Sequence, residues 1–130
     1  MRHFICILAT LLMLTSLSFA ADLPSATEVV IHAALDSGRP TLADFGARTC
    51  IPCKKMAPIL AELGREYQGQ ANVLFTDVHE TKKLAAAYRI QMIPTQIFFD
   101  TTGKEVKRHI GFMDKAAILK ELQAAGLKLK

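Results

Sequence analysis

Two cysteines separated by two residues are the part of this sequence best suited to chemistry. Cys50 and Cys53 lie between a strand-like run at Thr41–Ala47 and a helix-like run at Lys54–Tyr67. The start of a helix carries partial positive charge and unpaired backbone N–H groups. A thiol placed there is stabilised as the thiolate, which is the form that attacks disulfides. Because the second thiol follows one helical turn later, the pair can close a disulfide, and the motif predicts a redox site.

The same spacing also supplies half of a zinc site, since structural zinc sites usually have four cysteine or histidine ligands. His79 and His109 could complete such a set, but they lie in separate segments without the short spacing typical of zinc ligands. A purely structural disulfide is also disfavoured, because closing so short a loop removes little entropy from the unfolded chain. Redox chemistry without a metal or an organic cofactor is therefore the preferred interpretation.

The first 20 residues have the pattern of a secretory signal peptide. Arg2 lies in a short polar start, Phe4–Leu17 is an apolar run, and Ser18 and Ala20 are small residues at the positions that a signal peptidase reads. We expect cleavage after Ala20, with residues 1–20 as the signal and 21–130 as the exported, periplasmic domain. An uncleaved membrane anchor is the alternative, although the apolar run is shorter than the ~20 residues that span a bilayer.

Composition and charge narrow the function further. After cleavage the domain would keep two cysteines, both in the motif, in a compartment where disulfides persist. The formal net charge is +4, but the basic residues are scattered. No basic run is as long as a nucleic-acid-binding arm, and aromatic residues are not interleaved with the basic ones. We expect one small monomeric domain with no nucleic-acid partner.

Helical and strand-like patterns alternate along the rest of the chain. Ser25, followed three residues later by Glu28, fits a capping box for a first helix that ends near Gly38. Strands are expected at 41–45, 72–78, 95–99 and 105–110, with further helices at 54–67, at 81–88 and from Asp114 onward.

The expected order α-β-α-β-α-β-β-α predicts parallel strands joined by right-handed crossovers, with one antiparallel hairpin closing the sheet at 100–103. The fold class is therefore α/β, with a mixed central sheet of about four strands and helices on both faces.

Two stretches of the chain resemble landmarks of the thioredoxin family. Residues 43–60, with the sequence ADFGARTCIPCKKMAPIL, resemble the family's active-site strand and helix. Residues 88–95, with the sequence YRIQMIPT, resemble its Ile-Pro-Thr loop. Gly103 and Gly111 match the family's hairpin and pre-helix glycines. The resemblance covers roughly residues 41–122 and implies a thioredoxin fold.

The resemblance also implies a role for each matched residue. Cys50 would be the attacking cysteine and Cys53 the buried resolving cysteine, with Asp44 as the buried acid beneath it. Pro94 would be the cis-proline beside the disulfide, which leaves the preceding backbone free to pair with an extended substrate. The expected substrate-binding residues are Ile51, Pro52, Ile93 and Pro94.

The chain departs from the family pattern around the motif. Gly46 and Thr49 stand at positions where thioredoxins carry Trp, so the flat apolar platform beside the disulfide is reduced. Ile51 stands where thioredoxins carry Gly. Phe75 replaces a Lys near the buried acid, which removes a cation that would keep Asp44 ionised. These changes bear on substrate choice and redox potential, not on the dithiol chemistry.

The implied activity is that of a thiol–disulfide oxidoreductase that reduces disulfides of other proteins. A membrane electron donor or a reductase would then re-reduce it. One alternative is a dithiol oxidase of the same fold, which is disfavoured because Ile51-Pro52 places no His inside the motif. The other is a metal- or copper-delivery module using Cys50 and Cys53, for which no further ligand is well placed.

Overall fold

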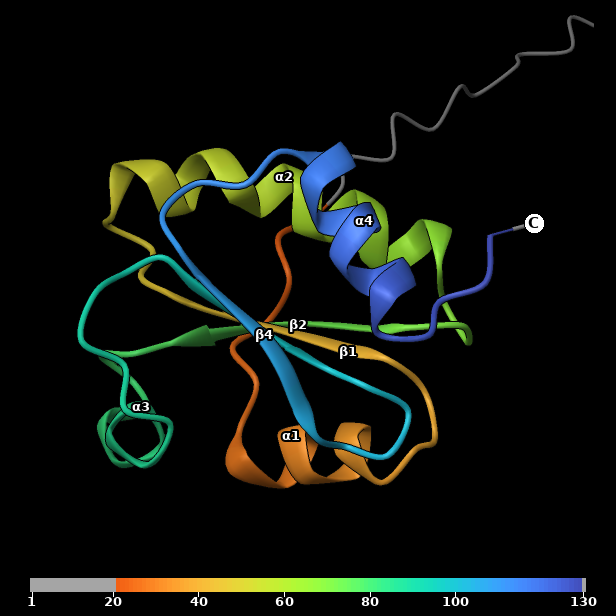
Figure 1. Ribbon diagram of the computed structural model, residues 1–130. Helices are drawn as coiled ribbons and strands as arrows, with labels where there is room; N and C mark the ends of the chain where they lie inside the picture. The colour runs from red at the N-terminus through yellow and green to blue at the C-terminus, as the bar shows by residue number, and fades with distance from the viewer. Residues whose placement is uncertain (1–20, 130) are drawn as a thin grey trace, which may run out of the picture.

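Helices and strands alternate along residues 21–129, the part of the chain that the computed structural model describes (Figure 1). The signal peptide predicted for residues 1–20 lies outside the described residues. The helices are α1 (Glu28–Leu35), α2 (Ile51–Glu66), α3 (Lys82–Ala87) and α4 (Lys115–Ala124). The strands are β1 (Thr41–Gly46), β2 (Asn72–Asp77), β3 (Thr95–Phe99) and β4 (Glu105–Ile110). The predicted element order is confirmed.

The strands form one mixed sheet in the order β2-β1-β3-β4. β1 and β2 are parallel, as expected, and β3 and β4 form the expected antiparallel hairpin. The expectation that β3 would also run parallel is wrong, because β3 pairs antiparallel with β1. The register shows how this arises. β2 ends beside Gly46 and β3 begins beside Phe45, so the connecting residues 78–94, which include α3, stay at one end of the sheet and the chain re-enters in the opposite direction.

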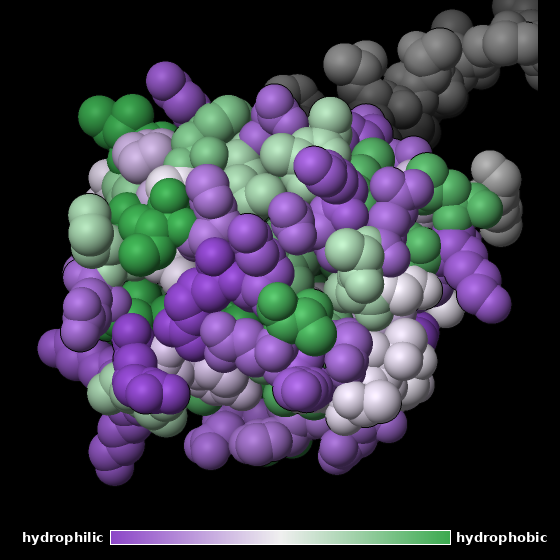
Figure 2. Space-filling view, in the orientation of Figure 1, coloured by the Kyte–Doolittle hydropathy of each residue, from purple (hydrophilic) through white to green (hydrophobic). Residues whose placement is uncertain are grey.

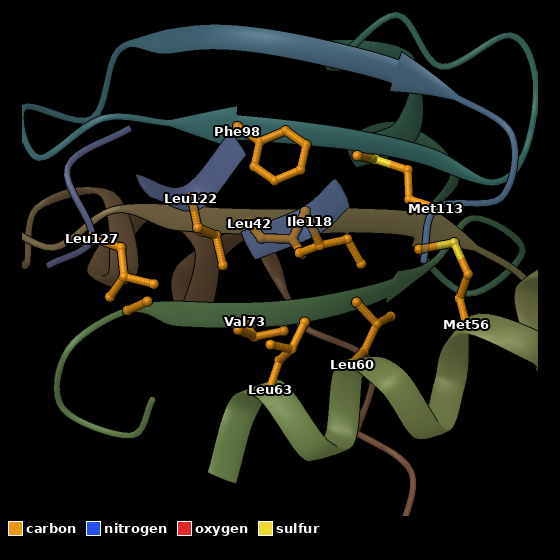
Figure 3. Close-up of a cluster of buried hydrophobic side chains, with 11 residues drawn as sticks. Leu42, Met56, Leu60, Leu63, Val73, Phe98, Met113, Ile118, Leu122 and Leu127 are labelled. Carbon is orange, nitrogen blue, oxygen red and sulfur yellow. The ribbon is translucent and has the colours of Figure 1, made fainter. Parts of the chain in front are cut away.

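Each face of the sheet is covered by two helices, α2 and α4 on one side and α1 and α3 on the other (Figure 1). The larger core cluster lies between the sheet and the α2/α4 pair (Figure 3). It includes Leu42, Met56, Leu60, Leu63, Phe98, Ile118 and Leu122. The smaller cluster lies on the α1/α3 side and includes Ile31, Ala43, Phe45, Leu84, Ile97 and Phe99. The mixed sheet with two covered faces confirms the predicted fold class.

The start of α1 differs from the predicted capping box. Thr27 is the N-cap, and its hydroxyl accepts a hydrogen bond from the backbone of Val30. Ser25 instead accepts from the backbone N–H of Asp77, and Ala26 donates to the carbonyl of Phe75. Ser25 is therefore used to attach the incoming chain to the open edge of β2, which brings residues 22–26 close to the cysteine motif.

The β3–β4 turn depends on a glycine, as the resemblance implied. Gly103 has φ +80°, and a Cβ there would lie 3.0 Å from the carbonyl oxygen of Leu35. The Asp100 carboxylate accepts from the backbone N–H groups of Thr102 and Lys104 and so closes the same turn. Among residues 21–129, no helix has the length and apolar character needed to cross a membrane.

Candidate active site at the start of helix α2

The cysteine motif lies at the N-terminus of α2, where the sequence placed it. Cys50 is the N-cap residue and Pro52 lies in the first turn, where its missing N–H leaves no helical hydrogen bond unmade. The sulfur of Cys50 accepts a hydrogen bond from the backbone N–H of Cys53 at 3.4 Å. Cys50 and Cys53 form a disulfide, with their Cα atoms 5.2 Å apart. The Cys50 sulfur is thus directed at the positive end of the helix.

The two sulfurs differ in access to solvent. Cys50 is half-buried, whereas Cys53 is only 4% exposed. Ile51 is 70% exposed, and Pro52 beside it is also exposed. A substrate can therefore approach the first cysteine from solvent but not the second.

Asp44 is fully buried in β1, beside a fully buried amide side chain on the neighbouring strand. That side chain is Gln96 on β3, whose Nε2 donates to Asp44 Oδ1 at 2.9 Å. The other carboxylate oxygen of Asp44 has no hydrogen-bond partner. Burial raises the pKa of Asp44 to about 6, against the opposing effect of the Gln96 hydrogen bond. Asp44 therefore changes protonation close to neutral pH.

Gly46 occupies a tightly packed position, where the Cβ of a larger residue would crowd its neighbours. A Cβ at this position would lie 3.1 Å from the sulfur of Cys53 and 3.2 Å from the ring of Phe75. The space next to this position, where the family carries Trp, is thus bordered by Phe75 on β2 and by Cys53 of the motif. Thr49, at the second Trp position, is exposed.

Arg48 is a site residue that the sequence reasoning missed. Its guanidinium lies 4.3 Å from the centre of the Phe75 ring, and it donates to the carbonyl of Leu23 at 2.6 Å. Its backbone N–H donates to the Asp77 carboxylate. Beside this group lies a cavity of about 90 Å³, lined in part by Cys53, Lys54 and Ala57. Arg48 therefore covers Phe75 and holds the chain that precedes α1 next to the resolving cysteine.

The Ile-Pro-Thr loop lies at the start of β3. The peptide bond between Ile93 and Pro94 is cis, Pro94 is buried and Ile93 is half-buried. The carbonyl of Pro94 accepts from the backbone N–H of Gly111 at 2.8 Å, which links this loop to the segment before α4.

Several large apolar side chains are exposed around the start of α2. They are Ile51, Met92, Ile110 and Phe112. Figure 2 shows apolar surface over the N-terminal end of α2 and the adjoining loops. Met113 does not contribute to this surface, because it is only 7% exposed and belongs with Met56 to the larger core cluster (Figure 3).

The histidines considered as metal ligands are dispersed. His79 is exposed after β2, and His109 is half-buried on β4. Within residues 21–129, no group of three or more His, Cys, Asp or Glu side chains is arranged to hold a metal ion.

Gln96 is the second site residue that the sequence reasoning missed. The available signal was a single amide in the run Thr95-Gln96-Ile97-Phe98-Phe99, a strand expected to be buried. A buried polar side chain needs a hydrogen-bond partner. The Asp44 carboxylate is that partner, so the two buried polar residues could have been paired by this argument.

Comparison with known proteins agrees with this arrangement. A family model described as thioredoxin matches residues 25–124. A thioredoxin from Staphylococcus aureus is 45% identical over 74 residues, which cover 57% of this chain and 70% of that protein. The bifunctional thioredoxin reductase/thioredoxin of Mycobacterium leprae is 41% identical over 88 residues. That match covers 68% of this chain but only 19% of the larger protein.

Solved structures give the same result. A mutant thioredoxin from Halobacterium salinarum NRC-1 aligns with a TM-score of 0.72 and 26% identity, covering 85% of this chain and 96% of that one. Chloroplastic thioredoxin z aligns with a TM-score of 0.69 and 26% identity, covering 81% and 95%. Since the family model spans most of the chain, including the cysteine motif, this chain belongs to the thioredoxin family of thiol–disulfide oxidoreductases.

Proposed function

We propose that this protein is exported and reduces disulfide bonds of other proteins through Cys50 and Cys53. The observation that carries the proposal is the contrast between the two sulfurs. Cys50 is accessible at the helix N-terminus, whereas Cys53 is buried behind it. Such an arrangement suits a nucleophile that meets the substrate and a second thiol that acts only after the first has reacted.

The reaction takes place in two exchanges. The Cys50 thiolate attacks one sulfur of the substrate disulfide, and the other substrate sulfur leaves as a thiolate. Cys53 then loses its proton to the Asp44 carboxylate and attacks the Cys50 sulfur. A Cys50–Cys53 bond forms, and the second substrate sulfur leaves with the electron pair and takes a proton from solvent. Both released substrate thiolates are protonated from solvent, and Asp44 returns the Cys53 proton to solvent. The substrate has then gained two electrons and two protons, and the protein dithiol is oxidised to the disulfide.

Substrate binding is proposed to involve the exposed tip of the motif and the loop before β3. Ile51 and Pro52 supply apolar contact. The backbone of Ile93, in the loop before β3, is proposed to pair with an extended peptide. The exposed Met92 and Phe112 extend the apolar contact area where the family's Trp is missing.

The direction of electron flow is proposed to be reductive. The motif contains no His, and Asp44 provides a base for the resolving step. Electrons would come from a membrane donor or from a reductase. A relative in which a thioredoxin is joined to a thioredoxin reductase supports the second kind of donor.

Equilibration with glutathione tests the direction. We expect a reduction potential below about −200 mV, towards that of thioredoxin, together with reduction of insulin by the dithiol form. A potential near about −120 mV, as in a strong oxidase, would contradict the proposal and favour the dithiol oxidase. The metal content of the purified protein, measured in the same preparation, tests the metal-delivery alternative.

Cys50 is expected to be the more reactive thiol, because it caps α2 and is open to solvent. Alkylation of the reduced protein at different pH values should modify Cys50 first, with a pKa below the ordinary value of about 8.5. The Cys53→Ser variant should accumulate mixed disulfides with substrates. Their accumulation in the Cys50→Ser variant instead would mean that the two roles are reversed.

Asp44 is expected to act in the resolving step. A carboxylate accepts a proton only when ionised, so release of the mixed disulfide should accelerate as the pH rises through about 6. The Asp44→Asn variant should lose this acceleration and release substrate at least about tenfold more slowly at pH 7. Alkylation of Cys50 in the same variant serves as the control and should change little. An unchanged release profile would leave Asp44 with a structural role only.

The same substitution should affect stability in a pH-dependent way. The pKa of Asp44 is raised from 3.8 to about 6 in the folded protein. The folded state therefore binds more protons than the unfolded state between these values, and its stability falls as the pH rises through that window. Above about pH 6 Asp44→Asn should raise the free energy of unfolding by up to about 3 kcal/mol. Urea titrations should show this gain at pH 7 and its loss near pH 4.

Export is proposed from the signal-peptide pattern of residues 1–20. The protein recovered from the periplasm should have an intact mass that begins at Ala21. A membrane-bound product that retains Met1 would contradict cleavage and favour the anchor.

A further inference from the structure

Four side chains form a row across the α2 face of the sheet. The strand register pairs Phe75 on β2 with Asp44 on β1, Asp44 with Gln96 on β3, and Gln96 with His109 on β4. Residues paired directly across neighbouring strands lie on the same face. Gln96 on β3 lies between Asp44 on β1 and His109 on the outer strand β4. It therefore separates the buried acid from this histidine.

Gln96 is itself completely buried. Its Nε2 donates to Asp44 Oδ1 at 2.9 Å and to the sulfur of Met56 at 3.2 Å. Met56 lies on α2 one turn after Cys53 and points from the helix into the core (Figure 3). Through these two contacts, Gln96 connects the carboxylate on β1 to the helix that carries both cysteines.

No cation lies next to this carboxylate among the described residues that share its face. The β2 neighbour is Phe75, which is apolar, and the β3 neighbour is the neutral amide. The titratable groups nearby are the Cys53 thiol on α2, in the reduced protein, and His109 beyond Gln96 on β4. Lys54, beside Cys53, is exposed. Among the described residues, Gln96 is thus the single one that donates a hydrogen bond to the Asp44 carboxylate.

We infer that Gln96 is the positioning residue of this active site, which holds the Asp44 carboxylate on the α2 face and sets the pH at which that carboxylate accepts the Cys53 proton. The inference rests on the role proposed for Asp44 in the resolving step. Gln96 contacts neither substrate nor the reacting sulfurs, so it acts entirely through Asp44.

An amide suits this position because it can form a hydrogen bond with the acid both when the acid is ionised and when it is protonated. The amide N–H stabilises the carboxylate before proton transfer. The protonated acid needs an acceptor instead, and a half-turn of the amide presents Gln96 Oε1, which has no partner in the present arrangement. A lysine would stabilise only the ionised acid. Gln96 can therefore hydrogen-bond with Asp44 in both protonation states, through its N–H when the acid is ionised and through Oε1 when the acid is protonated.

The test uses Gln96→Met, which keeps the length of the side chain and removes the hydrogen bond. The Asp44 carboxyl carbon is followed by NMR across pH in the oxidised protein, and release of the Cys50 mixed disulfide is measured over the same range. Loss of a hydrogen bond to an ionised group should move both midpoints up by about one pH unit. Release at pH 6 should then slow about fivefold. Gln96→Leu is the second variant, should Gln96→Met not fold.

Two controls make the outcome specific. His109→Gln removes the histidine at the outer end of the row, and it should leave both midpoints unchanged. Asp44→Asn combined with Gln96→Met should release substrate no more slowly than Asp44→Asn alone. A slower double variant would mean that Gln96 acts by some other route.

The two measurements distinguish a failure of the inference about Gln96 from a failure of the role proposed for Asp44. If the NMR midpoint of Asp44 is the same with and without the Gln96 amide, the inference is wrong whatever the kinetics show. If that midpoint moves but release does not follow it, Gln96 controls Asp44 as inferred, and the role proposed for Asp44 in catalysis is wrong instead.

Discussion

The first turn of α2 packs directly against the end of β1. At Gly46, a Cβ would come within 3.1 Å of the Cys53 sulfur. This contact fixes the depth of the motif. It places Cys53 against the sheet, where it is buried, and leaves Cys50 at the helix end, where solvent reaches it. The difference between the two thiols, on which disulfide exchange depends, follows from how α2 packs on β1.

The same packing explains why the acid beneath the motif is unusual. Asp44 precedes Gly46 by two residues on the same strand, so it faces the same helix and cannot reach solvent. Desolvation favours its neutral form. The hydrogen bond from the neighbouring Gln96 amide, and not a charged side chain, opposes that effect. The site thereby holds a carboxyl group that can be either proton donor or acceptor near neutral pH, which a dithiol needs in both directions of exchange.

Much of this arrangement could be predicted from the residues. The cysteine spacing, the apolar run before it and the helical periodicity after it were sufficient to place Cys50, Cys53 and the strands and helices around them. What could not be predicted depends on contacts between residues that are far apart in the sequence. Ser25 has the local signature of a helix cap, yet it is hydrogen-bonded to β2 far along the chain. The direction of β3 depends on which end of the sheet the connection at residues 78–94 returns to, which local propensity does not fix.

The departures from the family pattern are also linked to one another. Phe75 stands where the resemblance implies a lysine, and its ring lies beside Gly46, so that the Cβ of a larger residue at Gly46 would be tight against both Phe75 and Cys53. A cation is still present near the site, but it has moved outward. The Arg48 guanidinium lies over the outer face of the Phe75 ring and is anchored by the Leu23 carbonyl. The partners of this guanidinium are the Leu23 carbonyl and the Asp22 carboxylate, not the buried acid. The hydrogen bond to the Asp44 carboxylate comes instead from the neighbouring strand, from Gln96.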